Sequence, residues 1–119
     1  MIWKLDKSRA ICPQLCEQLC ARIAAGEFLP GQRIWSVREV ALEAGVNPNT
    51  VQRAFEQLEQ QGVLYSERGA GWFVAADTGA ARKLQQRLVR EKVGGFFAEM
   101  TALGMTPEEI KKIVEEWEL

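Results

Sequence analysis

The sequence predicts a mainly α-helical protein with one small β-hairpin, arranged as a compact first part and a two-helix second part. Apolar residues recur at three- and four-residue spacing in several stretches of the 119-residue chain, as amphipathic helices require. Two short apolar runs, residues 63–65 and 72–74, flank a glycine-rich interval and indicate the hairpin. Residues 77–79 (Asp-Thr-Gly) then break the pattern, so we expect one domain at residues 1–76 and a helical element at residues 77–119.

The first helix is expected to begin near Pro13, because the first helical turn tolerates a residue without a backbone N–H. Its apolar residues Leu15, Leu19 and Ile23 repeat every four positions. Gly26 can end this helix in a left-handed conformation, and residues 29–31 (Leu-Pro-Gly) follow as a turn.

The second helix is expected at residues 37–44. Ser36 is a favourable N-cap, and Glu39 stands where it can complete a capping box. Gly45 ends the helix, and we expect Val46 to be buried in the short connection that follows.

The third helix begins at Pro48, with Asn47 as its N-cap, and ends before Gly62. Its apolar residues at positions i, i+3, i+4 and i+7 are Val51, Ala54, Phe55 and Leu58. In the hairpin beyond it, Trp72 and Phe73 are expected to pack in the core rather than to stack on a ligand.

The second part of the chain contains a long helix, and Thr106 and Pro107 start a short last helix. Gly94 and Gly95 interrupt the long helix, either as a kink or as a point of close helix approach. The apolar side chains of this part exceed what two helices can bury alone, so we expect them to pair with a second copy. These side chains are Leu84, Leu88, Phe96, Phe97, Met100, Leu103, Ile110, Ile113 and Trp117.

The composition argues against several classes of protein. The chain is 47% hydrophobic without an apolar run of about 18 residues, and its start lacks the apolar stretch of a signal peptide, so we expect a cytoplasmic protein without a membrane partner. It contains no histidine and no glycine-rich phosphate loop of the usual spacing. The sequence therefore predicts no enzyme activity, no catalytic residues, no metal site and no cofactor.

The three cysteines, Cys12, Cys16 and Cys20, follow one another at intervals of one helical turn. This spacing is unfavourable for a disulfide, so reduced thiols are expected, at least one of them as a small core residue. A thiol redox switch or a soft-metal sensor acting through this stripe remains an alternative function.

The second and third helices, joined by residues 45–47, form a helix-turn-helix arrangement. In such a pair the second helix enters the major groove of DNA with its N-terminal residues nearest the bases. The exposed residues expected there suit base edges and phosphates: Asn47, Asn49, Thr50, Gln52 and Arg53. We also expect backbone N–H groups at the start of this helix to face phosphate.

Over about residues 10–76 the spacing of several residues resembles that of the GntR family of bacterial regulators. These residues are Gly31, Ser36, Arg38, Gly45, Val46, Thr50, Val51, Leu58, Gly62, Gly69 and Gly71. Residues 47–54 are most similar to the YtrA-like subfamily, in which a short pair of C-terminal helices mediates dimerisation. The resemblance implies a winged helix-turn-helix fold. It also implies a regulator, expected to be a repressor, that binds a pseudo-palindromic operator in double-stranded DNA as a homodimer, often at a transporter operon. It leaves open whether a small-molecule effector exists.

The resemblance also implies which residues contact DNA. They lie at the start of the second helix, at the start of the third helix and at the hairpin tip. They are Ser36, Arg38, Asn47, Pro48, Asn49, Thr50, Gln52, Arg53, Arg68, Gly69 and Gly71.

The sequence departs from the family pattern in ways that bear on affinity. Trp35 stands where the family usually has proline, and Pro48 and Gln52 stand where many members have arginine. Residues 26–75 carry four arginines against six glutamates, so this segment is net acidic. We therefore expect the protein to recognise DNA through a few well-placed residues in each of two copies, and not through a broad basic surface. The acidic balance also leaves a winged-helix protein-interaction module as an alternative function.

Overall fold

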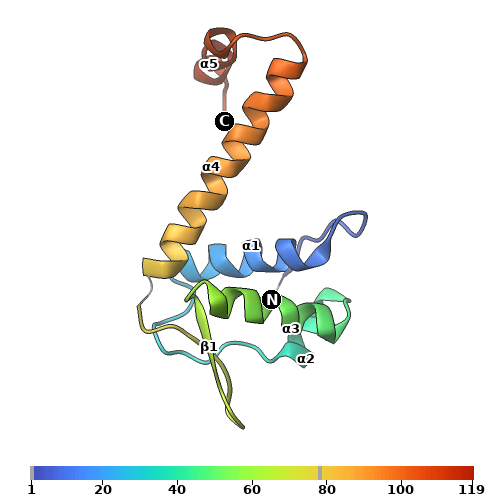
Figure 1. Ribbon diagram of the computed structural model, residues 1–119, viewed down its shortest axis with the longest axis vertical. Helices are drawn as coiled ribbons and strands as arrows, with labels where there is room; N and C mark the ends of the chain where they lie inside the picture. The colour runs from blue at the N-terminus through green and yellow to red at the C-terminus, as the bar shows by residue number, and fades with distance from the viewer. Residues whose placement is uncertain (1, 78) are drawn as a thin grey trace. The chain divides into compact units, whose positions relative to one another are not determined.

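The computed structural model describes residues 2–77 and 79–119 (Figure 1). Its elements follow in the order α1 (Ile11–Ala24), α2 (Val37–Ala44), α3 (Pro48–Gln60), β1 (Leu64–Glu67), β2 (Gly71–Val74), α4 (Gly79–Ala102) and α5 (Pro107–Glu116). The predicted mainly helical fold with one small hairpin is confirmed. The chain forms two compact units that divide between Gln85 and Gln86, inside α4. A functional division between residues 76 and 77 stays a prediction.

Recognisable local signals begin and end the helices of the first unit. Ser36 and Glu39 form a complete capping box at the start of α2, and Gly45 ends that helix in the left-handed region at φ +68°. Asn47 caps α3, whose first residue is Pro48. These bounds of α2 and the start of α3 are those that the sequence predicts, because each signal acts within three or four residues.

Helix α3 lies at the centre of the first unit, where it packs against α1, α2 and β1 (Figure 1). Its predicted apolar residues Val51, Ala54, Phe55 and Leu58 are each at most 1% exposed. On α1, Leu15, Leu19 and Ile23 are buried as predicted. Val46 is only half-buried, so the prediction of a buried anchor in the turn was wrong.

The hairpin pairs β1 with β2 in antiparallel register, with Leu64 opposite Val74 and Glu67 opposite Gly71. Trp72 and Val74 are buried, whereas Phe73 is half-buried and stacks on Tyr65. Segment 31–34 pairs with the other edge of β2, where the Ile34 N–H donates to the Trp72 carbonyl over 2.9 Å. The stretch between α1 and α2 thereby acts as a third, very short strand, which the sequence analysis does not predict.

The second unit contains the rest of α4 and the whole of α5. Helix α4 continues through Gly94 and Gly95, and a Cβ placed on either glycine would meet nothing within 4 Å. The two glycines are therefore not a point of close helix approach within the described chain. Thr106 and Glu109 form the predicted capping box at the start of α5, and Ile110 is buried. Among the described residues, no helix has both the length and the apolar character needed to cross a membrane.

Candidate nucleic-acid interface

The start of α2 is fixed by the hydrogen bonds of its capping box. The Glu39 N–H donates to the Ser36 hydroxyl over 3.0 Å, and the Ser36 N–H donates to Glu39 Oε1 over 3.1 Å. This backbone donor lowers the pKa of the Glu39 carboxyl, so the cap stays ionised at neutral pH. Arg38 is exposed within the same turn, so the capping box fixes the position from which Arg38 extends into solvent.

In the first turn of α3, the backbone N–H groups donate to acceptors of the N-cap residue Asn47. Pro48 has no N–H, and the Asn49 N–H donates to Asn47 Oδ1 over 2.8 Å. The N–H groups of Thr50 and Val51 donate to the Asn47 carbonyl over 3.0 and 3.3 Å. The N–H groups at this helix end are therefore paired within the turn, and their approach to phosphate stays a prediction.

The side chains at the start of α3 are accessible to different degrees. Asn49 and Arg53 are exposed together with Pro48, whereas Thr50 and Gln52 are half-buried. The Gln52 side-chain amide donates to Glu56 Oε1 over 2.9 Å, one turn further along α3. This bond orients the Gln52 amide without engaging its oxygen, and an oriented amide can pair with a base edge through one donor and one acceptor.

The tip of the hairpin is a tight turn over residues 67–70. The Ala70 N–H donates to the Glu67 carbonyl over 3.0 Å, and Gly69 has a φ of +77°. A glycine at this position allows the left-handed conformation that the turn requires. Arg68 is exposed at the tip, and its contact with DNA stays a prediction.

Arg33 is a cation near the hairpin that was not among the predicted site residues. It lies in the segment that pairs with β2, and its guanidinium covers Gly71. A Cβ at Gly71, whose φ is +112°, would lie 3.2 Å from Arg33 Nε. Arg33 therefore adds a second cation, besides Arg68, at the tip end of the hairpin. The apolar pair Ile34 and Trp35 after Arg33 is the weak signal that could have indicated this extra strand.

The cysteines of α1 face the interior of the first unit to increasing depth along the helix. Cys16 is half-buried, and its thiol donates to the carbonyl of Ala54 on α3 over 3.4 Å. Cys20 is fully buried, and its thiol donates to the carbonyl of Ala81 over 3.3 Å. Burial, with the adjacent Cys12, raises the pKa of Cys16 to about 12. These contacts favour core thiols over reactive thiolates.

The predicted pairing residues of the tail differ in exposure. Leu84 and Ile110 are buried by the chain itself, and Leu88, Phe97 and Met100 are half-buried. The exposed residues of the set are Phe96, Leu103, Ile113 and Trp117.

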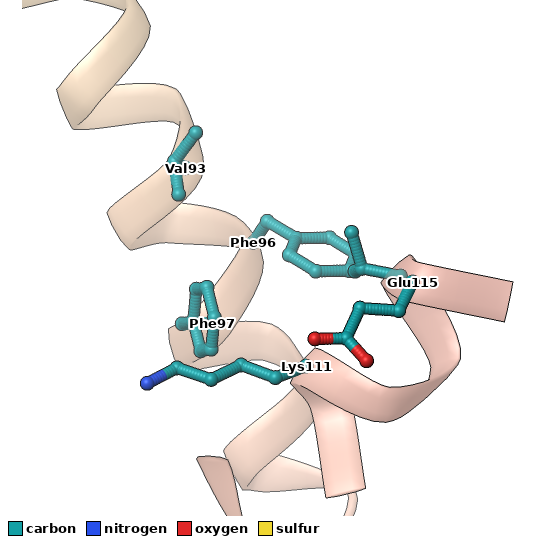
Figure 2. Close-up of a pocket in the computed structure, with 6 residues that line it drawn as sticks. Val93, Phe96, Phe97, Lys111 and Glu115 are labelled. Atoms are coloured by element: carbon teal, nitrogen blue, oxygen red, sulfur yellow. The ribbon is translucent and has the colours of Figure 1, made fainter. Parts of the chain in front are cut away.

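In the second unit, an open apolar groove of about 400 Å³ lies between α4 and α5. Phe96 and Phe97 project from α4 toward α5, with their rings edge to face at 5.9 Å (Figure 2). Val93 continues this apolar wall, and the side chains of Lys111 and Glu115 on α5 bring charge to the groove (Figure 2).

Comparison with known proteins identifies the family to which this arrangement belongs. Residues 13–74 match the family model described as bacterial regulatory proteins, gntR family. An HTH-type transcriptional regulator of Bacillus subtilis, YhcF, is 37% identical over 90% of this chain and 88% of its own length. The HTH-type transcriptional repressor YtrA of the same organism is 26% identical over 92% of this chain and 85% of its own length.

Solved structures agree with the fold and include complexes with operator DNA. A GntR family transcriptional regulator from Listeria monocytogenes superposes with a TM-score of 0.82 at 32% identity, covering 96% of this chain and all of its own. The DNA-binding domain of AraR in complex with operator ORE1 has a TM-score of 0.55 at 32% identity. It covers 63% of this chain and 94% of its own.

Proposed function

We propose that this chain, which belongs to the gntR family of bacterial regulatory proteins, is a repressor that binds a pseudo-palindromic operator as a homodimer. At the coarser level it is a helix-turn-helix transcriptional regulator rather than an enzyme. The observation that carries the proposal is the start of α3. There the N–H groups of the first turn are paired within the helix, and polar side chains together with Arg53 remain accessible. This is the arrangement in which a helix can enter the major groove.

Double-stranded DNA is the proposed partner, and side chains supply the contacts. Arg38 and Arg53 are exposed cations suited to phosphate, whereas Asn49 and Gln52 carry amides suited to base edges. Arg68, at the hairpin tip, is placed for the minor groove, whose negative potential attracts a cation. The complex of the AraR domain with its operator supports this assignment, because that domain shares the fold at 32% identity.

The tail supports the dimeric part of the proposal. Trp117 is 68% exposed, Ile113 is 45% exposed, and Phe96, which is 40% exposed, lines the apolar groove between α4 and α5. A second copy that covers this surface removes it from water. The resulting homodimer carries two copies of α3, one for each half of a pseudo-palindromic operator. The short relatives YhcF and YtrA, which this chain covers over most of their length, support placement in the YtrA-like subfamily.

The location and the target genes belong to the proposal as well. A regulator of bacterial DNA works in the cytoplasm, and a transporter operon is the target that we propose from the subfamily. Deleting the gene should raise the transcripts of the operon whose promoter the protein binds. If these transcripts fall instead, the protein is an activator.

Selection of random duplexes by the purified protein, followed by sequencing, tests the proposal directly. We expect an inverted repeat whose half-sites lie about 10 base pairs apart, because two recognition helices contact one face of the duplex. Fluorescence anisotropy should then show tighter binding to the selected duplex than to a scrambled one, with an affinity that falls as salt rises. Equal binding to both duplexes at every salt concentration would refute sequence-specific recognition.

Variants separate the proposed roles. Arg38→Ala should weaken binding to selected and scrambled duplexes alike, whereas Gln52→Ala should mainly reduce the preference for the selected one. Arg90→Ala removes the same charge from an exposed position of α4 and serves as the control.

The dimer has a test of its own. Ile113→Glu places a charge in the proposed interface and should give monomers in sedimentation velocity, with weaker operator binding. Leu42→Glu, at a residue of α2 that is 78% exposed, should leave the oligomeric state unchanged. A dimer that persists in Ile113→Glu would place the interface elsewhere.

A further inference from the structure

The segment before α1 is held firmly on the first unit. The side chain of Gln18 accepts from the Lys4 N–H over 3.0 Å and donates to the Lys4 carbonyl over 2.7 Å. One turn earlier, the side chain of Gln14 accepts from the Asp6 N–H over 2.8 Å and donates to the Asp6 carbonyl over 2.9 Å. Two glutamines on one face of α1 thus pair with the segment as a neighbouring strand would.

Aromatic residues hold the beginning of the same segment. Trp3 packs edge to face on Trp35 with ring centroids 5.9 Å apart. The Arg22 guanidinium lies over both rings, at 5.1 Å from the Trp3 centroid and 5.4 Å from the Trp35 centroid. Trp35, which stands where the family usually has proline, therefore helps to anchor this segment.

The segment ends in a closed turn that carries two cations, Lys7 and Arg9. The N–H and the hydroxyl of Ser8 both donate to Asp6 Oδ1, over 3.0 and 2.6 Å, and the Arg9 N–H donates to the Asp6 carbonyl over 3.2 Å. The Ser8 donors lower the pKa of Asp6, so the turn is closed by an ionised carboxylate at neutral pH. The turn fixes where Lys7 leaves the backbone.

From this turn the Lys7 ammonium reaches the connection between α2 and α3. Its Nζ donates to the Gly45 carbonyl over 2.9 Å, across 38 residues of sequence. Gly45 precedes the N-cap Asn47 by two residues, which is a span of at most about 7 Å along the backbone. An ammonium has three donors and the carbonyl takes one, so the charge is held beside the recognition helix with donors to spare.

The charge is placed where the helix end itself offers no donors. The backbone N–H groups of residues 49–51 are paired within the first turn of α3, and Pro48 has none. The surrounding segment, residues 26–75, is net acidic. Lys7 therefore adds a cation from outside this segment to the exposed Arg38 and Arg53, at a helix end whose own N–H groups are already paired.

We propose that Lys7 is a DNA-contacting residue that binds a backbone phosphate next to the recognition helix, positioned by the turn at residues 6–9. This inference rests on the proposed DNA-binding function. It adds a contact to those proposed at the starts of α2 and α3 and at the hairpin tip, and this contact carries no sequence information because it meets only phosphate.

The test compares Lys7→Gln with Lys4→Gln and Lys7→Arg in the full chain. Lys4 lies in the same held segment and is exposed, so its substitution removes the same charge from the opposite end of the segment. The dissociation constant for the selected duplex and for a scrambled duplex is measured by fluorescence anisotropy over a series of KCl concentrations. Thermal unfolding of each variant, followed by circular dichroism, reports separately on the capping of α2 by Lys7.

The slope of log K against log salt is negative. We expect Lys7→Gln to reduce its magnitude by about 0.9 for each bound copy, on both duplexes. Lys4→Gln should leave the slope unchanged, and Lys7→Arg should restore it. An unchanged slope in Lys7→Gln would overturn the inference, even with a lower unfolding temperature, because Lys7 would then serve only to cap α2. If Lys4→Gln reduces the magnitude of the slope equally, the inference is overturned too. The effect would then come from the net charge of the segment and not from the position of Lys7.

The same data distinguish this inference from the proposed function. If the unsubstituted protein binds neither duplex, the proposed function fails and the inference fails with it. If the unsubstituted protein prefers the selected duplex and Lys7→Gln has the same salt dependence, only the inference fails.

Discussion

The contact between Phe55 and Trp72 joins the recognition helix to the wing, and its strength can be measured. Phe55 on α3 is 1% exposed and Trp72 on β2 is 9% exposed. Their rings meet edge to face at 76°, with centroids 5.5 Å apart. Both Phe55→Leu and Trp72→Leu replace a ring by a smaller apolar side chain and remove this geometry without burying a polar group.

The expected magnitude follows from what each substitution removes. An edge-to-face pair contributes about 0.5–1.5 kcal/mol beyond the apolar area that it buries. The single substitutions also leave unfilled volume, so each should lower the free energy of unfolding by roughly 1–3 kcal/mol. The double variant should be less destabilised than the sum of the two, by the pair contribution of about 0.5–1.5 kcal/mol.

Urea unfolding followed by circular dichroism of the four proteins gives this coupling energy. The matched control is the cycle of Phe55→Leu with Phe73→Leu, because Phe73 points to the opposite face of β2 and stacks on Tyr65. The control cycle should be additive within about 0.5 kcal/mol. A coupling of Phe55 with Trp72 no larger than that of the control would refute the conclusion that this pair fixes the wing relative to α3.

Three further predictions concern other parts of the chain. Ser36→Ala should lower the free energy of unfolding by about 1 kcal/mol in urea titrations, because the Glu39 N–H loses its acceptor, and a change near zero would show that the cap is dispensable. Burial raises the pKa of Cys16 from near 9 to about 12, so the folded state favours the thiol and the unfolded chain ionises first. The stability of the natural chain relative to Cys16→Ala should therefore be constant below pH 9 and fall as the pH rises from 9 to 12, and a flat difference would contradict the burial of this thiol. Gly94→Ala should stabilise α4 by about 0.5–1 kcal/mol in thermal unfolding, because its Cβ meets nothing within the chain, whereas a loss of stability would indicate close approach by a second copy.

The helices of the first unit could be predicted because their signals are local. Ser36 with Glu39, Gly45, and Asn47 with Pro48 each act through hydrogen bonds or backbone preferences within a few residues, and the structure places α2 and the start of α3 where these signals stand. Val46 shows the limit of this reasoning. Its apolar side chain in a turn between two helices suggested burial, but the turn lies at the surface and leaves it half-exposed.

The candidate interface was predicted only in part, because several of its properties depend on partners distant in sequence. Arg33 reaches the tip end of the hairpin through the pairing of segment 31–34 with β2, for which the sequence offers only a weak signal. The sequence also did not show that the N–H groups at the start of α3 are paired, with Asn47 accepting from them through both its side chain and its carbonyl. That use of one residue as a double acceptor becomes visible only when the turn geometry is known.

The sequence by itself determined the order of helices and hairpin, their caps, and the polar residues at the start of α3. These features follow from hydrogen-bonding groups and apolar periodicity within one or two turns of chain. Tertiary structure alone decided where two cations lie, since Lys7 meets Gly45 before α3 and Arg33 meets Gly71 in the hairpin, each across 38 residues. It also decided that Leu84 and Ile110 are covered within the chain while Trp117 and Phe96 stay exposed. The physical reason is that burial and long-range charge placement depend on how packed elements meet, whereas a cap depends only on its own turn.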